Sequence, residues 1–113
     1  MRITRFESAP PYHPPLHRGV ECRRLQGHEA GPTECFWVGL SVYEPGGAAE
    51  ESTAAEETIY TVLDGELTLR HGGADYVLRR LDSVHLAKGE VRGLFNAGAE
   101  PATLLVAIAT PRN

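Results

Sequence analysis

The sequence predicts an all-β fold, either a sandwich or a barrel, and two observations support this prediction. The first is composition: the 113 residues include 12 glycines and 8 prolines and show no long helical period, as expected for short strands joined by tight turns. The second is residues 58–63 (Thr-Ile-Tyr-Thr-Val-Leu), which are rich in β-branched and aromatic residues and run into Asp64-Gly65. Such a pair between two strand-like segments predicts a hairpin, with residues 66–69 in its second strand.

Charge and hydropathy argue against two classes of partner. The net charge is −4 and the basic residues are dispersed along the chain, whereas nucleic-acid-binding proteins gather theirs on one face. The N-terminal stretch is charged, and no run approaches the roughly 20 apolar residues that span a bilayer. We therefore expect one cytoplasmic domain with no nucleic-acid or membrane partner, and we expect Cys22 and Cys35 to be reduced thiols on separate strands.

Residues 1–19 are predicted to form an extended N-terminal arm. Four prolines between residues 9 and 19 remove backbone donors and fix φ, so this stretch fits neither a helix nor a central strand. An arm of this kind covers a sheet edge or contacts a second subunit. We expect a homodimer in which residues 10–15 lie across the partner. His13 and His17 could instead reach a functional site.

The barrel is expected to occupy residues 20–110, with residues 35–43 as its longest clear strand. Alternation gives this strand two faces, one with Phe36, Val38, Leu40 and Val42 and the other with Trp37, Gly39, Ser41 and Tyr43. The second face mixes aromatic and small residues and could line a cavity. The alternative, that Trp37 is simply a core residue, stays open.

The remaining strands follow the same turn signals. Residues 66–71 and 74–79 are predicted to pair as a hairpin around Gly72-Gly73. The sequence predicts about eight strands in all, the others lying at residues 20–25, 58–63, 83–87, 91–96 and 102–109. Residues 111–113 form a short tail.

Two motifs then resemble those of the cupins, a family of small jelly-roll barrels built around a central metal. In the first motif, Gly46 and Gly65 fall on the two framing glycines. The family's two histidines and glutamate are replaced, in order, by Ser52, Ala54 and Thr58. In the second motif, the family's proline, glycine, histidine and asparagine positions hold Ala87, Gly89, Arg92 and Asn96. The resemblance covers residues 36–108 and implies a jelly-roll β-barrel.

The metal ligands of that family are all replaced in this chain. Neutral Ser52, Ala54 and Thr58 are poor ligands for a divalent transition ion. Arg92 brings a permanent positive charge to the place where the cation would lie. The sequence therefore predicts no ordinary cupin metal site and no cofactor, and the alternative that remains is a divalent metal held by other residues.

The same cavity offers other candidate site residues. The ligand-binding candidates are Arg92, Ser52, Thr58, Asn96 and Trp37, and the candidates for proton transfer are His85, Tyr60 and Glu57. Thr58 and Tyr60 share one face of a strand, so they point the same way. Glu57 then faces outwards unless a bulge re-aims it. His85 lies on the strand before Arg92, at a position that could face the interior.

Two classes of function fit this pocket. One is a metal-free or atypically metallated isomerase, lyase or hydrolase of a small carboxylate, in which Arg92 holds the anion. The other is a binding module for the same kind of ligand without chemistry, because one barrel fold serves many functions. In both, Arg92 requires a counter-charge. It comes either from an internal glutamate such as Glu57 or from a ligand carboxylate or phosphate.

Overall fold

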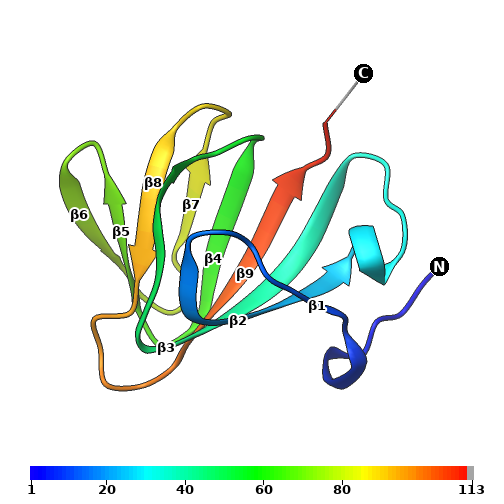
Figure 1. Cartoon of the computed structure of the whole chain (residues 1–113), viewed down its shortest axis with the longest axis horizontal. Helices are drawn as coiled ribbons and strands as arrows, with labels where there is room; N and C mark the ends of the chain where they lie inside the picture. The colour runs from blue at the N-terminus through cyan, green and yellow to red at the C-terminus, as the bar shows by residue number, and fades with distance from the viewer. Residues whose placement is uncertain (112–113) are drawn as a thin grey trace.

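The computed structural model describes residues 1–111 and confirms the all-β class. Over this range the chain forms nine antiparallel strands and two short 3-10 turns (Figure 1). In chain order these are η1 (Phe6–Ser8), β1 (Pro11–Tyr12), β2 (His17–Gln26), η2 (His28–Ala30), β3 (Phe36–Thr53), β4 (Thr58–Asp64), β5 (Leu67–His71), β6 (Ala74–Leu78), β7 (Ser83–Leu86), β8 (Val91–Phe95) and β9 (Ala102–Ala109). None of the described residues belongs to a helix long and apolar enough to cross a membrane. Two residues of the predicted tail, 112 and 113, lie outside the described range.

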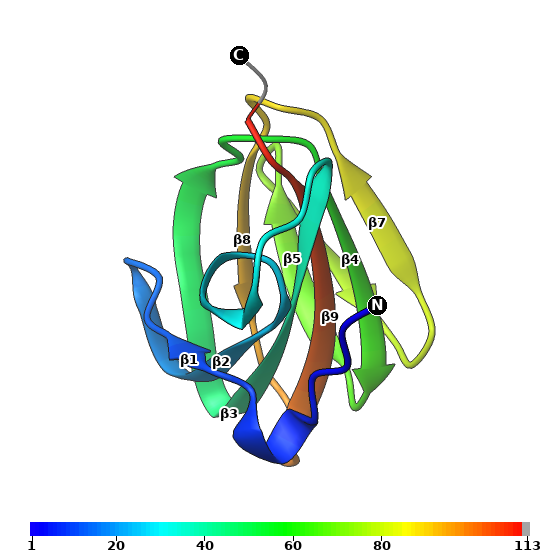
Figure 2. The ribbon, with the colours of Figure 1, turned by 90° about the vertical axis from the view of Figure 1, so that its right-hand side faces the viewer.

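Strand β3 is shared by the two sides of the barrel, one formed with β9 and the other with β8. Its first half pairs with β9, from Phe36 to Tyr43, and its second half pairs with β8, from Ala48 to Thr53. Figure 2 shows the two halves diverging, one beside β9 and the other beside β8. The chain changes layer near Gly47, where a Cβ atom would lie 2.3 Å from the carbonyl oxygen of Gly19 on β2. Only glycine permits so close an approach of two backbones.

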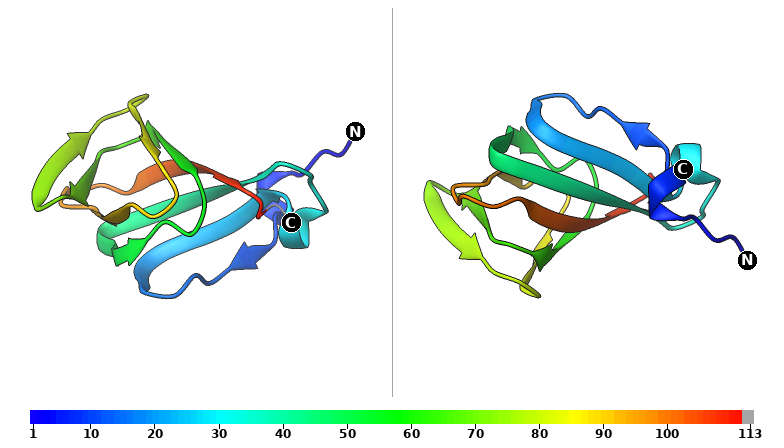
Figure 3. Two further views of the ribbon diagram at one scale, coloured as in Figure 1. Left: turned by 90° about the horizontal axis from the view of Figure 1, so that it is seen from above. Right: turned by 90° about the horizontal axis from the view of Figure 1, so that it is seen from below.

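The sheet is wound into a nearly closed barrel. The strands follow the order β6-β5-β8-β3-β9-β4-β7, and β2 also pairs with β3 and carries β1 on its other side. Figure 3 shows β6 and the β1–β2 pair on opposite sides of the barrel. Within residues 1–111, β6 and β7 end this order without pairing to each other, so a seam remains between them.

The predicted hairpin at Asp64-Gly65 is wrong in its pairing. A turn is present there, but β4 pairs with β7 and β9, whereas β5 pairs with β6 and β8. The turn therefore carries the chain from the side of the barrel formed by β9, β4 and β7 to the side formed by β6, β5 and β8. Gly65 has a φ of 72°, and a Cβ atom on it would lie 2.7 Å from the carbonyl oxygen of Pro101. The tight turn specifies a reversal of direction, while strands far along the chain occupy both edges of β4.

The hairpin predicted around Gly72-Gly73 is confirmed. His71 of β5 is paired with Ala74 of β6. Gly72 and Gly73 have φ values of 61° and 79°, the left-handed pair that a two-residue hairpin turn requires.

The buried core of the barrel is formed from β3, β4, β5, β7, β8 and β9, and partly buried residues of β1, β2 and β6 pack against it. Of the two predicted faces on β3, the one with Trp37, Ser41 and Tyr43 is buried, and Phe36 on the other is exposed. The residues that form the core are Trp37, Tyr43, Tyr60, Val62, Leu67, Leu69, Leu86, Leu94, Ala102, Leu104 and Val106. Cys22 is buried and Cys35 is exposed just before β3, and both are free.

The N-terminal segment lies on its own barrel. Pro11 and Tyr12 pair with Arg23 and Cys22 of β2, and Arg2 donates hydrogen bonds to the carbonyl oxygens of Gly31 and Pro32. β2 already begins at His17, earlier than the strand predicted from residue 20. The proline-rich segment therefore covers the edge of β2 in the same chain, and a homodimer stays a prediction.

Candidate functional site

A cavity of about 570 Å³ opens between the N-terminal segment and the interior face of the barrel. Figure 1 shows the β1–β2 connection passing in front of β4 and β9, and residues from all of these segments line the cavity. The lining consists of Pro11, Tyr12, His13, Pro14, Pro15, His17, Arg24, Glu29, Trp37, Ser41, Tyr43, Tyr60, Arg92, Leu104, Val106 and Ile108.

Arg92 reaches this cavity from β8. It is the cross-strand partner of Ser52 on β3, and its NH1 donates to the Ser52 carbonyl oxygen at 2.9 Å and to the Ser52 hydroxyl at 2.6 Å. Its Nε donates to the Tyr60 hydroxyl at 2.9 Å. Ser52, Tyr60 and Arg92, three of the predicted site residues, are thus in direct contact.

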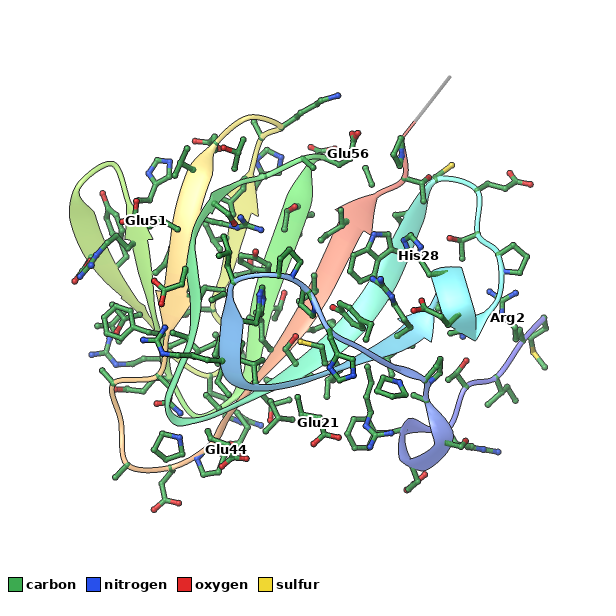
Figure 4. All side chains as sticks on the ribbon, viewed as in Figure 1. Arg2, Glu21, His28, Glu44, Glu51 and Glu56 are labelled. Carbon is green, nitrogen blue, oxygen red and sulfur yellow. The ribbon has the colours of Figure 1, made fainter. Side chains whose placement is uncertain are left out.

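Among residues 1–111 no carboxylate forms a salt bridge with Arg92, and the same is true of Arg2, Arg5 and Arg80, but of these four only Arg92 lines the cavity. Five other arginines have such a partner: Arg18, Arg23, Arg24, Arg70 and Arg79. The internal counter-charge suggested for it, Glu57, lies elsewhere and bonds to His85. Figure 4 shows the labelled Glu21, Glu44 and Glu56 at the edges of the molecule. The guanidinium therefore presents uncompensated positive charge to the cavity.

Three tyrosines surround the same space. Tyr43 is 2% exposed and Tyr60 5% exposed, and Tyr12 contributes from β1. Burial is the main cause that raises the pKa of Tyr12 and of Tyr43 far above the usual phenol range. Both phenols are therefore neutral at any ordinary pH, and they serve as hydrogen-bonding hydroxyls and not as bases.

Tyr12, Arg24 and Trp37 form another part of the cavity lining, with the rings of Tyr12 and Trp37 perpendicular to each other. The Arg24 guanidinium lies 3.6 Å from the centre of the Tyr12 ring and 4.3 Å from that of Trp37, and its Nε donates to Glu29 at 3.0 Å. The ring of Trp37 also meets the ring of His28 in an edge-to-face arrangement, with centroids 5.3 Å apart. Trp37 is thus both core and cavity wall, which unites the two alternatives drawn from the sequence. One face of its ring is covered by Arg24 and is therefore not free for a ligand.

Glu29 is the carboxylate of the cavity lining in the described part of the chain. Its pKa is lowered, first by a hydrogen bond from its own backbone N–H and then by Arg24. It is ionised at neutral pH. The charged lining residues are therefore Arg24 and Arg92 against Glu29, so the cavity is positive inside a protein whose net charge is −4.

His85 and Glu57, two of the three proton-transfer candidates, lie outside the cavity. Their side chains are 55% and 62% exposed and form a hydrogen bond of 2.7 Å with each other. The reason is alternation: Thr58 and Tyr60 point inwards, so Glu57 and Ile59 point outwards, and His85 is the cross-strand partner of Ile59. The outward direction that alternation predicted for Glu57 is observed, whereas His85 does not face the interior, so neither side chain can transfer a proton within the cavity as proposed from the sequence.

Thr58 and Asn96 are buried but use their polar atoms internally. The Thr58 hydroxyl donates to the Glu56 carbonyl oxygen at 3.0 Å. The Asn96 amide donates to the carbonyl oxygens of Tyr43 at 3.0 Å and Glu100 at 2.7 Å, and its oxygen accepts the Gly98 N–H at 2.9 Å. Neither residue lines the cavity. Both are better described as structural residues than as the ligand-binding residues predicted.

The cavity also contains residues that sequence reasoning left aside or treated as secondary. His13 and His17, for which the sequence offered a functional role only as an alternative to a subunit contact, both line the cavity. Tyr12, Arg24 and Glu29 line it as well, and no sequence motif marks them. The available signal was weak, because only the pairing of β1 with β2 brings this segment beside the barrel opening.

The residues at the cupin metal-ligand positions do not fit a metal. Ser52 and Arg92, which stand at two ligand positions of the cupin motifs, are in contact. The guanidinium of Arg92, however, brings a fixed positive charge to the place where the metal cation would lie. Ala54 offers no ligand atom, and the hydroxyl of Thr58 is directed at a backbone carbonyl. Across residues 1–111, no three side chains of His, Cys, Asp or Glu form a group suited to a metal ion. The absence of a bound metal stays a prediction.

Comparison with known proteins places this chain among cupins. The sequence profile described as "Cupin domain" matches residues 39–108. A protein named "Beta-D-galactosidase Rv1717" from Mycobacterium tuberculosis is 57% identical over 111 residues, covering 98% of this chain and 96% of that protein.

Solved structures show the same fold at low identity. The polyketide cyclase RemF of Streptomyces resistomycificus superposes with a TM-score of 0.86 at 17% identity, covering 99% of this chain and 81% of that one. A predicted oxalate decarboxylase of Thermotoga maritima gives 0.80 at 23% identity, with 98% and 100% covered. A sugar phosphate isomerase of Silicibacter pomeroyi gives 0.76 at 19% identity, with 95% and 74% covered. These likenesses concern the barrel alone.

Proposed function

The chain belongs to the cupin family, and we propose that its cavity binds β-D-galactosides and hydrolyses them. The observation that carries this proposal is a cavity lined by neutral hydroxyls in a chain 57% identical, almost end to end, to a protein named a β-D-galactosidase. Fold alone would not support it, because cupin barrels of similar shape carry names of unrelated activities.

The chemistry of the lining suits a sugar. A pyranose presents hydroxyls that both donate and accept, and the hydroxyls of Tyr12, Ser41, Tyr43 and Tyr60 do the same. Arg92 adds a donor-only group at one side, and Leu104 and Val106 supply apolar surface for the C–H groups of the ring. A volume of about 570 Å³ lies within the usual range of ligand pockets, roughly 300–1,000 Å³.

Hydrolysis in this cavity would differ from that of most glycosidases. Those enzymes use two carboxyl groups, one as acid and one as base or nucleophile. The described lining holds one, Glu29, which is ionised. Glu29 can accept a proton or stabilise positive charge on the sugar, but it cannot donate. The proton for the leaving group must come from a neutral hydroxyl or from a histidine of the cavity mouth.

A second candidate is a binding protein for a small carboxylate without chemistry. The observation that favours it is Arg92, whose guanidinium has no carboxylate partner within residues 1–111 and could hold a carboxylate in bidentate geometry. The excess positive charge of the lining points the same way. Such a ligand would satisfy the counter-charge that a partly buried arginine requires.

One set of measurements separates the two candidates. Turnover of 4-nitrophenyl β-D-galactoside, with the corresponding glucoside as control, tests hydrolysis. Calorimetric titration with galactose and with galacturonate tests binding. Galactoside-selective turnover supports the first candidate, and tight binding of galacturonate without turnover supports the second. If neither sugar binds and neither glycoside is hydrolysed, both candidates are wrong.

A further inference from the structure

Tyr60 stands apart from the other two phenols of the cavity because a cation is bonded to its oxygen. The hydroxyl accepts a hydrogen bond from Arg92 Nε at 2.9 Å. Tyr60 lies on β4 with its side chain 5% exposed, and it lines the cavity. Its phenol is therefore held at a fixed position at the inner wall.

The direction of that hydrogen bond determines where the Tyr60 proton points. A guanidinium has only donors, so the phenol oxygen must be the acceptor. Its own O–H is then left for another partner, and no acceptor for it is found among the residues that the structure describes. Since the hydroxyl borders the cavity, the proton is available to a bound ligand.

Arg92 is itself anchored so that it cannot turn away from Tyr60. Its NH1 is fixed by two oxygens of Ser52, the carbonyl at 2.9 Å and the hydroxyl at 2.6 Å. A guanidinium keeps its charge at every working pH. When Tyr60 gives up a proton, the negative charge that develops on its oxygen meets a positive group already in place, which is the arrangement that lowers a barrier most.

The other phenols lack this arrangement. Tyr43 is equally buried, but in residues 1–111 its hydroxyl bonds to no protein group, and burial raises its pKa. At Tyr12 the cation of Arg24 lies over the ring, 3.6 Å from its centre. Burial outweighs that cation and raises the Tyr12 pKa. Tyr43 and Tyr12 are binding hydroxyls, and Tyr43 is a matched control for Tyr60.

We propose that Tyr60 is the general acid of the galactoside hydrolysis proposed above, with Arg92 as the group that stabilises its phenolate. The glycosidic C1–O bond breaks with its electron pair on the leaving oxygen, and that oxygen takes the Tyr60 proton. A water oxygen bonds to C1. The proton that this water loses restores the phenol, so the protein is unchanged after each turnover. This inference rests on the proposed function.

The test compares Tyr60→Phe with Tyr43→Phe on two substrates that differ in leaving group. 4-Nitrophenolate departs without a proton, whereas an alkoxide, as from methyl β-D-galactoside, needs one. General acid catalysis contributes roughly 10²–10⁴-fold. Tyr60→Phe should therefore lower kcat/KM by about 10²-fold or more for the methyl glycoside and only a few-fold for the nitrophenyl glycoside. Tyr43→Phe should lower both to a similar degree.

Arg92→Lys is a second variant. It keeps the positive charge but loses the planar guanidinium that bonds to Tyr60 and Ser52 together. Its kcat/KM should fall selectively for the methyl glycoside, as in Tyr60→Phe. Circular dichroism and thermal melts establish that each variant is folded. Equal losses on both substrates in Tyr60→Phe and in Arg92→Lys, or no loss on either, would overturn the role of Tyr60 while leaving the proposed function standing. If the wild-type protein hydrolyses neither substrate, the proposed function fails and the role of Tyr60 fails with it.

Discussion

The two ends of strand β8 carry two polar residues with opposite roles. Asn96, just after the strand, is 2% exposed, and its side-chain amide forms hydrogen bonds with the backbone of Tyr43, Gly98 and Glu100. Arg92, near its start, bonds to Tyr60 and Ser52 and finds no carboxylate among residues 1–111. Both fall on motif positions of the cupin family. The comparison teaches that a family frame fixes where residues lie, while partners in space decide which of them are open to a ligand.

The largest expected effect is on stability, from Asn96→Ala. The change leaves the buried Tyr43 carbonyl oxygen and the part-buried Glu100 carbonyl oxygen without their donor, and the part-buried Gly98 N–H without its acceptor. Each unsatisfied buried group costs about 1–3 kcal/mol, so we expect a loss of about 3 kcal/mol in the free energy of unfolding, measured by urea denaturation. Ligand affinity of the folded fraction should be unchanged. A variant as stable as wild type that has lost its ligand would reverse the roles assigned to Asn96 and Arg92.

Arg92→Ala should have the opposite profile. Charge-assisted hydrogen bonds to a ligand are worth about 1.5–3 kcal/mol each, so affinity for galactose or galacturonate should fall by roughly tenfold to a hundredfold. The melting temperature should fall less than in Asn96→Ala, because the guanidinium neutralises no internal carboxylate and its partners are only part-buried, with Tyr60 at the cavity where water can replace it. Calorimetry and a thermal melt on one preparation check both statements. If this variant unfolds, the residue is structural and resembles Asn96.

Glu90 gives a smaller effect that depends on pH, at the turn before β8. It accepts the Ala87 N–H at 2.7 Å, and this bond, followed by contact with His71, holds the Glu90 pKa below its ordinary value of 4.5. A lowered pKa stabilises the fold above pH 4.5, and that contribution is lost as the pH falls through the folded-state value.

Unfolding of Glu90→Gln should therefore depend less on pH than unfolding of wild type below pH 4.5. The difference between the two proteins should be greatest near neutrality. Thermal melts from pH 7 to pH 3 test this expectation. Parallel curves for the two proteins would show that the Ala87 contact contributes nothing.

The smallest effect is expected from His85→Ala. The pair with Glu57 is more than half exposed on both sides, and exposed pairs of this kind contribute roughly 0–1 kcal/mol. Neither unfolding nor turnover of a galactoside should change beyond experimental error. A loss of turnover would show that this outer pair takes part in the reaction, as the sequence suggested before its orientation was known.

The sequence allowed the strands to be predicted well, and the site only in part. Local alternation placed Trp37, Ser41 and Tyr43 on one face, and the structure turns that face into the cavity. The motif frame brought Ser52 beside Arg92. His85 could not be oriented in the same way, because alternation tells which residues share a face without telling which face is inside. That choice is made by the pairing of His85 with Ile59.

The pairing of distant strands was also beyond local reasoning. The Asp64-Gly65 turn has the composition of a hairpin, yet β9, which lies about 40 residues further on, pairs with β4. The cavity mouth depends on a similar event, since β1 brings Tyr12 and the two histidines into place only by pairing with β2. The residues next to Tyr12, His13 and His17 in the sequence do not indicate this pairing of β1 with β2.

The dual membership of β3 has a consequence for how the protein is made. This strand needs β9 beside its first half and β8 beside its second, and β4 also needs β9. During translation, neither strand can complete its hydrogen bonds until residues 102–109 have left the ribosome. Until then the nascent chain exposes unpaired edges, which are prone to association with other chains. Folding should be late, cooperative and slow for a chain of this size, and a cell that overproduces the protein would need chaperones to hold the unfinished barrel.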